Sequence, residues 1–360
     1  MVTMRDVARL AGVSITTVSH VVNSTRAVAP ETRAKVLDAI EQTGYTGDAI
    51  ARSLVTGGTQ SLGVAISLVA NPHFAELIRA IEHEATRSGY TLVLADTHDD
   101  PETERSAVRM LRSRRVDGLV LTPSPRDSGS VVPELKRLGV PVVLLDRLTT
   151  SQDIDQVGPE NVYATSGLVR HLAENGHRRI GMISGATGLA TTSERVLGYR
   201  LGLGRSRLRW DESLVVAGVS ADPADDLTGD TASDTTGYPP PEATGEQGED
   251  PVAEALTALL ALADPPTAVI AGNSTVLRGV LHECRRRGVT VGSELAVVGY
   301  DDVDWAELVD PPMTTVAQPL AEMGSLAVRL LLERIADPDG NPVTKRLPTA
   351  FMHRRSCGCD

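Results

Sequence analysis

Residues 12–23 read GVSITTVSHVVN, and the spacing of their residues predicts how the N-terminus folds. Gly12 suits a turn with positive φ, and Ser14 can cap the helix that follows. Three valines then recur at i, i+3 and i+4, which places them on one inward-facing side: Val18, Val21 and Val22. The other side of this helix carries methyl groups, hydroxyls and one imidazole, without Lys or Arg: Ile15, Thr16, Ser19 and His20.

Two further helices are predicted to flank this segment. Thr3 can cap the first, with Asp6 three residues on in the manner of a capping box. Pro30 suits the first turn of the third, which ends at Gly44. The inner side of that third helix is expected to carry Val36, Leu37 and Ile40. Three short helices with this turn spacing predict a helix-turn-helix unit, which places its second helix in the major groove of DNA.

The charge of the chain is unevenly distributed. The 360 residues carry a formal net charge of −12, which opposes contact with phosphate. Nine of the acidic residues, and no basic one, fall within residues 218–250, a segment rich in Pro and Gly. Because these nine acids lie in one segment, the net charge of the rest of the chain is much closer to neutral. We expect the segment to be a disordered insertion that can lie far from the DNA-binding end.

The composition indicates the compartment. No apolar run approaches the roughly 18 residues needed to cross a bilayer, and the N-terminus lacks the continuous apolar centre of a secretory signal. Three cysteines, Cys284, Cys357 and Cys359, are too few for a disulfide framework in a chain of this length. We therefore expect a cytoplasmic protein that does not enter the membrane.

After residue 60 the pattern changes to short apolar runs that alternate with amphipathic stretches. SLGVAISLV (61–69) precedes FAELIRAIEHEATRSG, and the alternation continues through VPVVLLD (140–146). A second series after residue 158 contains RRIGMIS, TAVIA and ELAVVGY. This βαβ periodicity predicts parallel sheets with helices on both faces. Two such series predict two similar lobes whose strand ends enclose a cleft for a small molecule.

The predicted fold class is therefore α/β, with a small all-α helix-turn-helix head followed by two doubly wound lobes. The expected boundaries are a head at 1–46, a hinge helix and linker at 47–59, an N-lobe at 60–157 with 320–347, and a C-lobe at 158–319 with 348–360. The hinge segment AIARSLVT is too short for a stable isolated helix, so it should be ordered only when something else holds it.

Motifs throughout the chain resemble those of the LacI/GalR family of bacterial transcription repressors. They include TMRDVARLAGVSITTVSHVVN (3–23), AIARSLVTGGTQSLGV (49–64), HLAENGHRRIGMISG (171–185) and ELAVVGYDDVDWAELVDPPMTTVAQP (294–319), in the family's order. The resemblance runs nearly end to end, apart from the acidic segment. It implies a homodimer whose heads bind a palindromic operator in double-stranded DNA. It also implies a core like that of periplasmic binding proteins, which binds a small effector, commonly a sugar.

The resemblance further implies which residues contact DNA. Ile15, Thr16 and His20 take positions that read bases, and hydroxyls or helix N-terminal amides can hold phosphates without formal charge. Leu54 matches a hinge leucine that wedges into the minor groove, with an ordinary linker leucine as the alternative. The implied set is Thr3, Ser14, Ile15, Thr16, Thr17, Ser19, His20, Asn23, Thr32 and Leu54. Three departures from the family's pattern predict weaker or altered binding: His20 for arginine, Ala29 for a capping serine, and Gly47-Asp48 for Pro-Asn, where Asp48 can still cap.

The resemblance also places eight residues around the effector, each just past a predicted strand or near the start of a helix: Phe74, Asp146, Arg147, Thr191, Arg195, Asn273, Asp301 and Trp305. Asp and Arg side chains bond hydroxyls, and an aromatic face covers the apolar side of a ring, so a polyol is expected. The alternatives are a nucleoside, an amino-acid-like acid held by the two arginines, or no ligand. Trp305 is equally compatible with a surface or lobe-contact position.

The sequence favours a regulator over an enzyme, because no G-x-S-x-G, P-loop or H-E-x-x-H pattern occurs, and no cofactor is expected. His353, Cys357 and Cys359 offer three metal ligands, but a tail with incidental thiols is the favoured interpretation, so no metal is expected. The favoured function is a DNA-binding repressor of carbohydrate-utilisation genes under control of the cleft ligand. A regulator of another ligand, or of none, is the alternative. A stand-alone binding protein is disfavoured because residues 1–58 supply a complete head.

Overall fold

The computed structural model describes residues 2–23, 26–45, 58–67, 71–125, 131–150, 153–218 and 250–359. Nearly all of the predicted hinge (47–59), with Leu54, lies outside the described residues, as does most of the acidic segment (218–250). Contacts divide the chain into two units, 1–61 with 115–117 and the remainder, and each is described by itself. No helix in the described part of the chain is long and apolar enough to span a membrane.

The head consists of α1 (Met4–Ala11), α2 (Ile15–Asn23) and α3 (Pro30–Thr43). Gly12 ends α1 in the left-handed region at φ 65°, as the turn prediction requires. The head core contains Val7, Ala8, Val18, Val21, Val36, Ala39 and Tyr45. The prediction that Leu37 faces inward is wrong, because its side chain is 48% exposed. Successive helical residues are about 100° apart, so Val36 and Ala39 share the inner face and Leu37 turns away from it.

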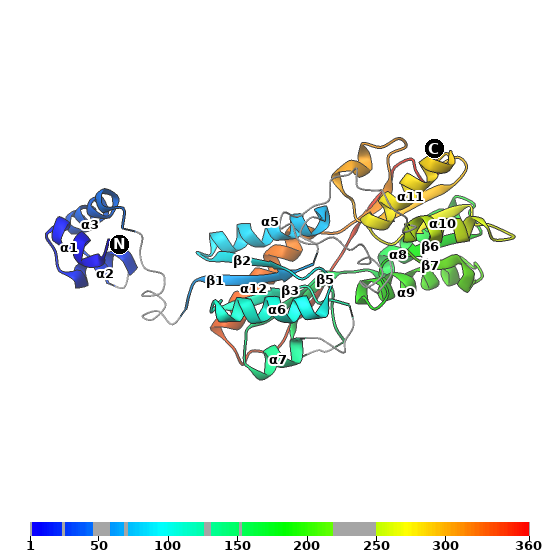
Figure 1. The fold of residues 1–360 in the computed structure, drawn as a ribbon. Coiled ribbons are helices and arrows are strands. Elements are labelled where there is room, and N and C mark those ends of the chain that lie inside the picture. The colour runs from blue at the N-terminus through cyan, green and yellow to red at the C-terminus, as the bar shows by residue number, and fades with distance from the viewer. Residues whose placement is uncertain are drawn as a thin grey trace, which may run out of the picture. The chain divides into compact units, whose positions relative to one another are not determined.

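The N-lobe is built on a six-stranded sheet in the order β11-β5-β4-β3-β1-β2. Its strands are β1 (Ser61–Ile66), β2 (Thr91–Asp96), β3 (Gly118–Leu121), β4 (Val142–Leu145), β5 (Asp155–Pro159) and β11 (Thr344–Leu347), and its helices are α5 (Pro72–Arg87), α6 (Pro101–Ser113), α7 (Val132–Arg137) and α12 (Leu320–Ala336). Helices cover both faces of the sheet (Figure 1). Gly324 lets α12 approach α5 closely, because a Cβ atom there would lie 2.7 Å from the Cβ of Ala80.

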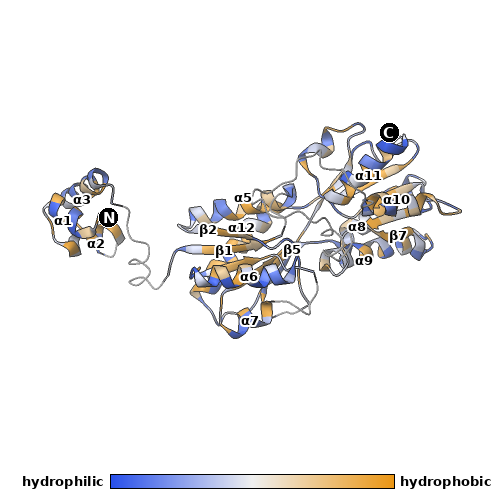
Figure 2. Ribbon diagram, viewed as in Figure 1, coloured by the Kyte–Doolittle hydropathy of each residue, from blue (hydrophilic) through white to orange (hydrophobic). Residues whose placement is uncertain are grey.

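The C-lobe repeats this plan with the strand order β12-β10-β9-β8-β6-β7. Its strands are β6 (Ile180–Ser184), β7 (Val215–Ala217), β8 (Ala268–Ala271), β9 (Ala296–Tyr300), β10 (Thr314–Ala317) and β12 (Ala350–Met352), and its helices are α8 (Val162–Glu174), α9 (Ala190–Arg205), α10 (Pro251–Leu260) and α11 (Ser274–Arg287). Two 3-10 turns, Glu212–Leu214 and Asp304–Glu307, complete it. Only β12 runs antiparallel among its paired strands in the described residues. Apolar residues concentrate on the strands and on the helix sides that cover them (Figure 2).

The chain passes between the two sheets three times, within 159–162, 317–320 and 347–350. The predicted fold class, a helical head followed by two α/β lobes, is therefore confirmed. β5 continues two residues past the expected end of the first N-lobe segment at 157, because Gly158 and Pro159 still pair with β11. The crossings bring the carboxyl ends of strands from both sheets to one region, where the candidate site lies.

Candidate functional site

Most of the residues implied to contact DNA lie on α2 or at its N-terminal cap, whereas Thr3 precedes α1 and Thr32 lies on α3. Ser14, Ile15 and Thr16 are exposed, with Ile15 at 45%, whereas Thr17, Ser19, His20 and Thr32 are half-buried. The Ser14 hydroxyl accepts a hydrogen bond from the Thr17 amide at 3.0 Å, so it caps α2 as predicted. The side chain of Asn23 lies outside the described residues, as does Leu54. Ser14, Ile15 and Thr16 therefore present hydroxyl and methyl groups to solvent at the start of α2.

The cap of α1 uses the Thr3 side chain that was implied to contact DNA. The Thr3 amide and hydroxyl both donate to Asp6 Oδ2, at 3.0 and 2.7 Å. These hydrogen bonds lower the pKa of Asp6. Ala29, in contrast, makes no side-chain cap on α3, as its residue type predicts.

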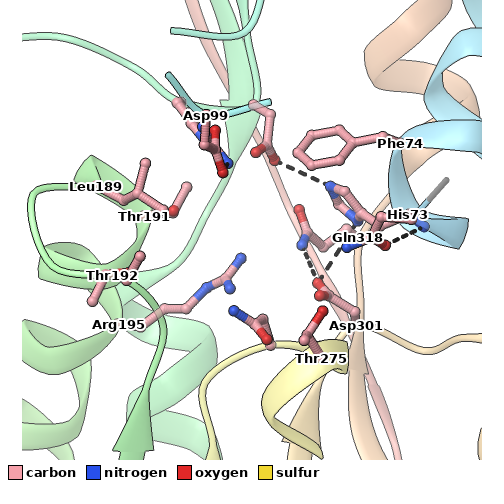
Figure 3. Close-up of a pocket in the computed structure, with 15 residues that line it drawn as sticks. His73, Phe74, Asp99, Leu189, Thr191, Thr192, Arg195, Thr275, Asp301 and Gln318 are labelled. Carbon is pink, nitrogen blue, oxygen red and sulfur yellow. Dashed lines mark hydrogen bonds and ion pairs between the residues drawn. The ribbon is translucent and has the colours of Figure 1, made fainter. Parts of the chain in front are cut away.

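A cavity of about 150 Å³ lies between the lobes, and both lobes supply its lining (Figure 3). It brings together seven of the eight residues implied to hold the effector: Phe74, Asp146, Arg147, Thr191, Arg195, Asn273 and Asp301. The structure adds residues that sequence reasoning missed: Asn71, His73, Asp99, Ala186, Leu189, Thr192, Thr275 and Gln318. Trp305 is not among the lining residues, and it packs instead against the C-lobe core.

The two lobes present equivalent carboxylates to the cavity. Asp146 directly follows β4, and Asp301 directly follows β9. Both residues have left-handed backbones, with φ of 68° and 71°. This conformation is uncommon for a residue with a side chain, and such strain concentrates at functional sites. The turn at the end of each strand therefore directs one carboxylate into the cavity from each lobe.

His73 lies between these two carboxylates. Its Nε2 is 3.4 Å from Asp146 Oδ1, and its Nδ1 is 3.8 Å from Asp301 Oδ1. Burial of this side chain opposes protonation, but the charge of Asp301 and the hydrogen bond and charge of Asp146 outweigh it, so the pKa of His73 is raised. Because His73 begins α5 in the N-lobe, its charged form attracts the C-lobe carboxylate. The sequence analysis named Phe74 in the motif NPHF (71–74) as an effector residue but not its neighbour His73.

The raised pKa of His73 predicts a pH-dependent stability. A group whose pKa is raised by folding stabilises the folded state fully below its unfolded pKa, near 6.5, and the effect is lost as pH rises through the folded pKa. We therefore expect the melting temperature of the wild type to exceed that of His73→Gln most at about pH 6, with the gap narrowing toward pH 9. His83→Gln, an exposed histidine on the same helix, is the matched control. A gap that does not change with pH would contradict the bridging role.

Both cavity arginines are already bonded to protein acceptors. Arg147 forms a two-pronged ion pair with Asp99 and donates to the Pro123 carbonyl at 3.0 Å. Arg195 donates to Asn161 Oδ1 at 3.0 Å and to the Gly272 carbonyl at 2.6 Å. The Arg195 guanidinium also lies 3.7 Å from the centre of the Tyr300 ring. Both arginines are therefore held in the walls of the cavity. The charge of Arg147 is paired with Asp99, whereas Arg195 bonds only neutral oxygens in these contacts.

Two buried oxygens in the site, Gln318 Oε1 and Asp146 Oδ1, lack a full set of hydrogen-bond donors. Gln318 donates from Nε2 to Asp301 Oδ1 at 2.5 Å, but its own buried Oε1 accepts none, and Asp146 Oδ1 has only the ion pair with His73. Asp301 Oδ2 accepts from the Ser274 amide at 3.0 Å. Buried acceptors without partners are rare, and a ligand that brings O–H donors would satisfy them.

A second hollow of about 400 Å³ adjoins the first and shares Arg147 and Leu189 with it. Its far side carries the ion pair between Glu194 and Arg346, 2.6 Å from Nη2 to Oε1. The small cavity therefore has room next to it for a further ring of a longer ligand.

Comparisons with known proteins agree with this construction. Residues 3–48 match the family described as bacterial regulatory proteins, lacI family. Residues 59–213 match the periplasmic binding proteins and sugar binding domain of the LacI family, and residues 169–357 match a periplasmic binding protein-like domain. The head, the two lobes and the cavity between them define a DNA-binding regulator with a ligand-binding core.

Individual relatives assign this regulator to its family. The transcriptional repressor PurR of Mannheimia succiniciproducens is 34% identical over 358 residues, which cover 99% of this chain and 98% of the relative. The PurR repressor of Photobacterium profundum is 32% identical over 94% of this chain and 93% of its own. The chain belongs to the LacI family of bacterial regulatory proteins and is a DNA-binding transcriptional repressor. Its relatives are repressors rather than enzymes, in line with the expected non-enzymatic role.

Two solved structures are similar over the full chain. The transcriptional regulator CelR in complex with cellobiose is 31% identical, with a TM-score of 0.69 and coverage of 99% of this chain and 100% of that one. The lac repressor dimer bound to operator and the anti-inducer ONPF is 25% identical, with a TM-score of 0.80 and 99% coverage of both chains.

Proposed function

We propose that this repressor adjusts its operator affinity to a neutral polyhydroxylated ligand, a sugar, bound in the cavity between the lobes, and that it controls carbohydrate-utilisation genes. The observation that carries the proposal is the set of carboxylate and amide oxygens facing the cavity while both arginines are bonded elsewhere. Hydroxyl donors match unsatisfied acceptors, and Phe74 offers an apolar face to a ring. The similar CelR structure holds cellobiose, which supports a sugar.

An amino-acid-like acid fits this site less well. Its carboxylate would approach Asp99, Asp146 and Asp301, and Arg147 is already paired with Asp99. Arg195, which bonds neutral oxygens, is then one cation against these acids. A nucleoside would need a flat apolar slot, and Phe74 is the single Phe, Tyr or Trp among the described residues that line the small cavity. The carboxylates therefore disfavour an acid, and the single Phe74 face disfavours a nucleoside, which leaves a sugar as the favoured ligand.

The DNA-binding part of the proposal rests on the head. Ile15, Thr16 and His20 are proposed to contact bases in the major groove, and the hydroxyl residues around them to contact phosphates. The lac repressor dimer on its operator supports a homodimer that binds a palindrome, with one head for each half-site. Because the operator is chromosomal, the proposed place of action is the cytoplasm.

Ligand and operator are proposed to communicate through the relative position of the lobes. His73 and Asp146 come from the N-lobe and Asp301 from the C-lobe. A ligand that bonds these groups is proposed to change the free-energy difference between a closed arrangement, in which the lobes contact each other through His73 and Asp301, and an open one. A ligand shifts such an equilibrium only by its differential affinity for the two arrangements.

The test is a thermal-shift screen of the full chain against monosaccharides, disaccharides, sugar phosphates, nucleosides and amino acids. A sugar at about 100 times its dissociation constant should stabilise the protein by roughly 2.7 kcal/mol, while amino acids should have no effect. Disaccharide binding without monosaccharide binding would indicate that the adjoining hollow is also used. Stabilisation by nucleosides or acids alone, or by no compound, would overturn the sugar proposal and leave the repressor assignment intact.

A second prediction concerns Leu54, for which the proposal rests on the family resemblance. Leu54→Ala should weaken specific operator binding by roughly tenfold or more, because the wedge acts only where the duplex is kinked at its centre. Non-specific binding should change little, since phosphate contacts dominate it. Fluorescence anisotropy with operator and with scrambled DNA measures both affinities. Equal loss on the two DNAs would show that Leu54 is an ordinary linker residue.

A further inference from the structure

We propose that four side chains at the far end of the C-lobe, His171, His353, Cys357 and Cys359, form a structural zinc site. One ligand atom from each residue lies within 4.8 Å of all the others, and this is the one such His/Cys/Asp/Glu group found in the described residues. The sequence showed only the last three, because His171 is 182 positions before His353 and reaches them through the fold.

The distances agree with a tetrahedral ion. Zinc bound to thiolate sulfur at about 2.3 Å and to imidazole nitrogen at about 2.05 Å places neighbouring S and N ligands about 3.6 Å apart. His171 Nε2 lies 3.5 Å from Cys359 Sγ, and His353 Nε2 lies 3.5 Å from Cys357 Sγ and 3.1 Å from Cys359 Sγ. The four atoms therefore need only small shifts to hold the ion.

The chemistry of the donor set selects the metal. Two thiolates and two neutral imidazoles suit Zn²⁺ and neutralise its charge, and the absence of carboxylates in the group disfavours Mg²⁺ or Ca²⁺.

The backbone around the group is specifically shaped. Ser356 is buried, and its hydroxyl donates to the Val297 carbonyl at 2.5 Å and accepts from the Thr314 amide at 2.8 Å, which anchors the tail beside Cys357. Gly358 has φ 74°, and a Cβ atom there would lie 2.2 Å from the Gly292 carbonyl oxygen. Only glycine allows the turn that brings Cys359 back toward Cys357.

The site is distinct from the effector cavity. His171 lies in the last turn of α8, ten residues after Asn161, which caps the same helix and bonds Arg195 of the cavity. At 1.5 Å per residue, the two ends are about 15 Å apart. The ion would therefore tie the C-terminal tail to the first helix of the C-lobe rather than contact the effector.

The experiment uses the full chain without a histidine tag, purified under reducing conditions without added metal. Elemental analysis should find about one zinc per chain. If the metal has been lost or is removed, titration with Zn²⁺ should show tight binding of one zinc ion per chain and raise the melting temperature. Titration with Co²⁺ should give the visible absorption of a tetrahedral thiolate site. His353→Gln changes an exposed residue and should weaken Zn²⁺ affinity by more than about 100-fold. A loss of this size exceeds that expected for a residue that only orients a metal ligand.

Matched controls separate this site from chance binding. His83→Gln and Cys284→Ala each remove one residue of the same type outside the group, and both should keep one zinc per chain. Zinc affinity equal in His353→Gln and His83→Gln would overturn the proposal. A disulfide between Cys357 and Cys359 in the reduced preparation, or a titration without a tight equivalent in the wild type, would also overturn it.

Discussion

Replacing Asp301 by asparagine is expected to weaken binding of the sugar found in the screen by roughly 10- to 150-fold, about 1.5–3 kcal/mol, the usual loss for hydrogen bonds to a charged group. Asp301 is buried, it receives hydrogen bonds from Ser274 and Gln318, and it faces His73 at 3.8 Å. The neutral amide keeps the shape of the side chain but loses its charge. Isothermal titration of the two proteins with the same sugar measures the change.

A second readout of this substitution needs no ligand. The charge of Asp301 is the foremost of the attractions that keep the pKa of His73 raised against burial, so Asp301→Asn should lower that pKa. An NMR titration of the His73 ring detects the shift. Asp304→Asn, an exposed acid three residues away, should leave both sugar affinity and the His73 titration unchanged. Identical sugar binding by the two variants would remove Asp301 from the site.

Replacing Arg334 by alanine is expected to lower the free energy of unfolding by about 3–5 kcal/mol, because it leaves a buried carboxylate without its partner. Arg334 on α12 donates to Asp155 from Nε at 2.8 Å and from Nη2 at 3.2 Å. Asp155 at the start of β5 is 3% exposed and also accepts from the Val343 amide at 2.8 Å. The pair therefore joins three segments of the N-lobe.

Arg329→Ala is the matched control for this prediction. Arg329 is exposed on the same helix, and its loss should change stability by no more than about 0.5 kcal/mol. Urea unfolding of both variants measures the difference. If Arg334→Ala unfolds with the same midpoint as Arg329→Ala, then the buried Asp155 does not depend on the ion pair. Combining Arg334→Ala with Asp155→Asn should recover part of the lost stability, since the orphaned charge is then absent.

The head and the lobes were predictable because their signals are local. The cap at Ser14, the turn at Gly12 and the valine spacing each involve residues within a few positions of one another, and all three occur in the structure. Leu37 was wrongly placed within the same local pattern, because Val36 and Ala39 define the inner face of α3 and Leu37 lies about 100° from Val36.

For the candidate site, too, part could be predicted from the sequence and part is visible only in the tertiary structure. The sequence by itself, through its family resemblance, implied that Asp146 and Asp301 face the cleft. Their positions just past predicted strands agree, because parallel strands present their carboxyl ends at one edge. Only the tertiary structure decided that His73 lies between those two carboxylates and that both arginines are bonded to other residues. It also decided that His171 joins the C-terminal cysteines. These contacts join residues distant in the chain, and their positions depend on how sheets and helices pack, which no local pattern specifies.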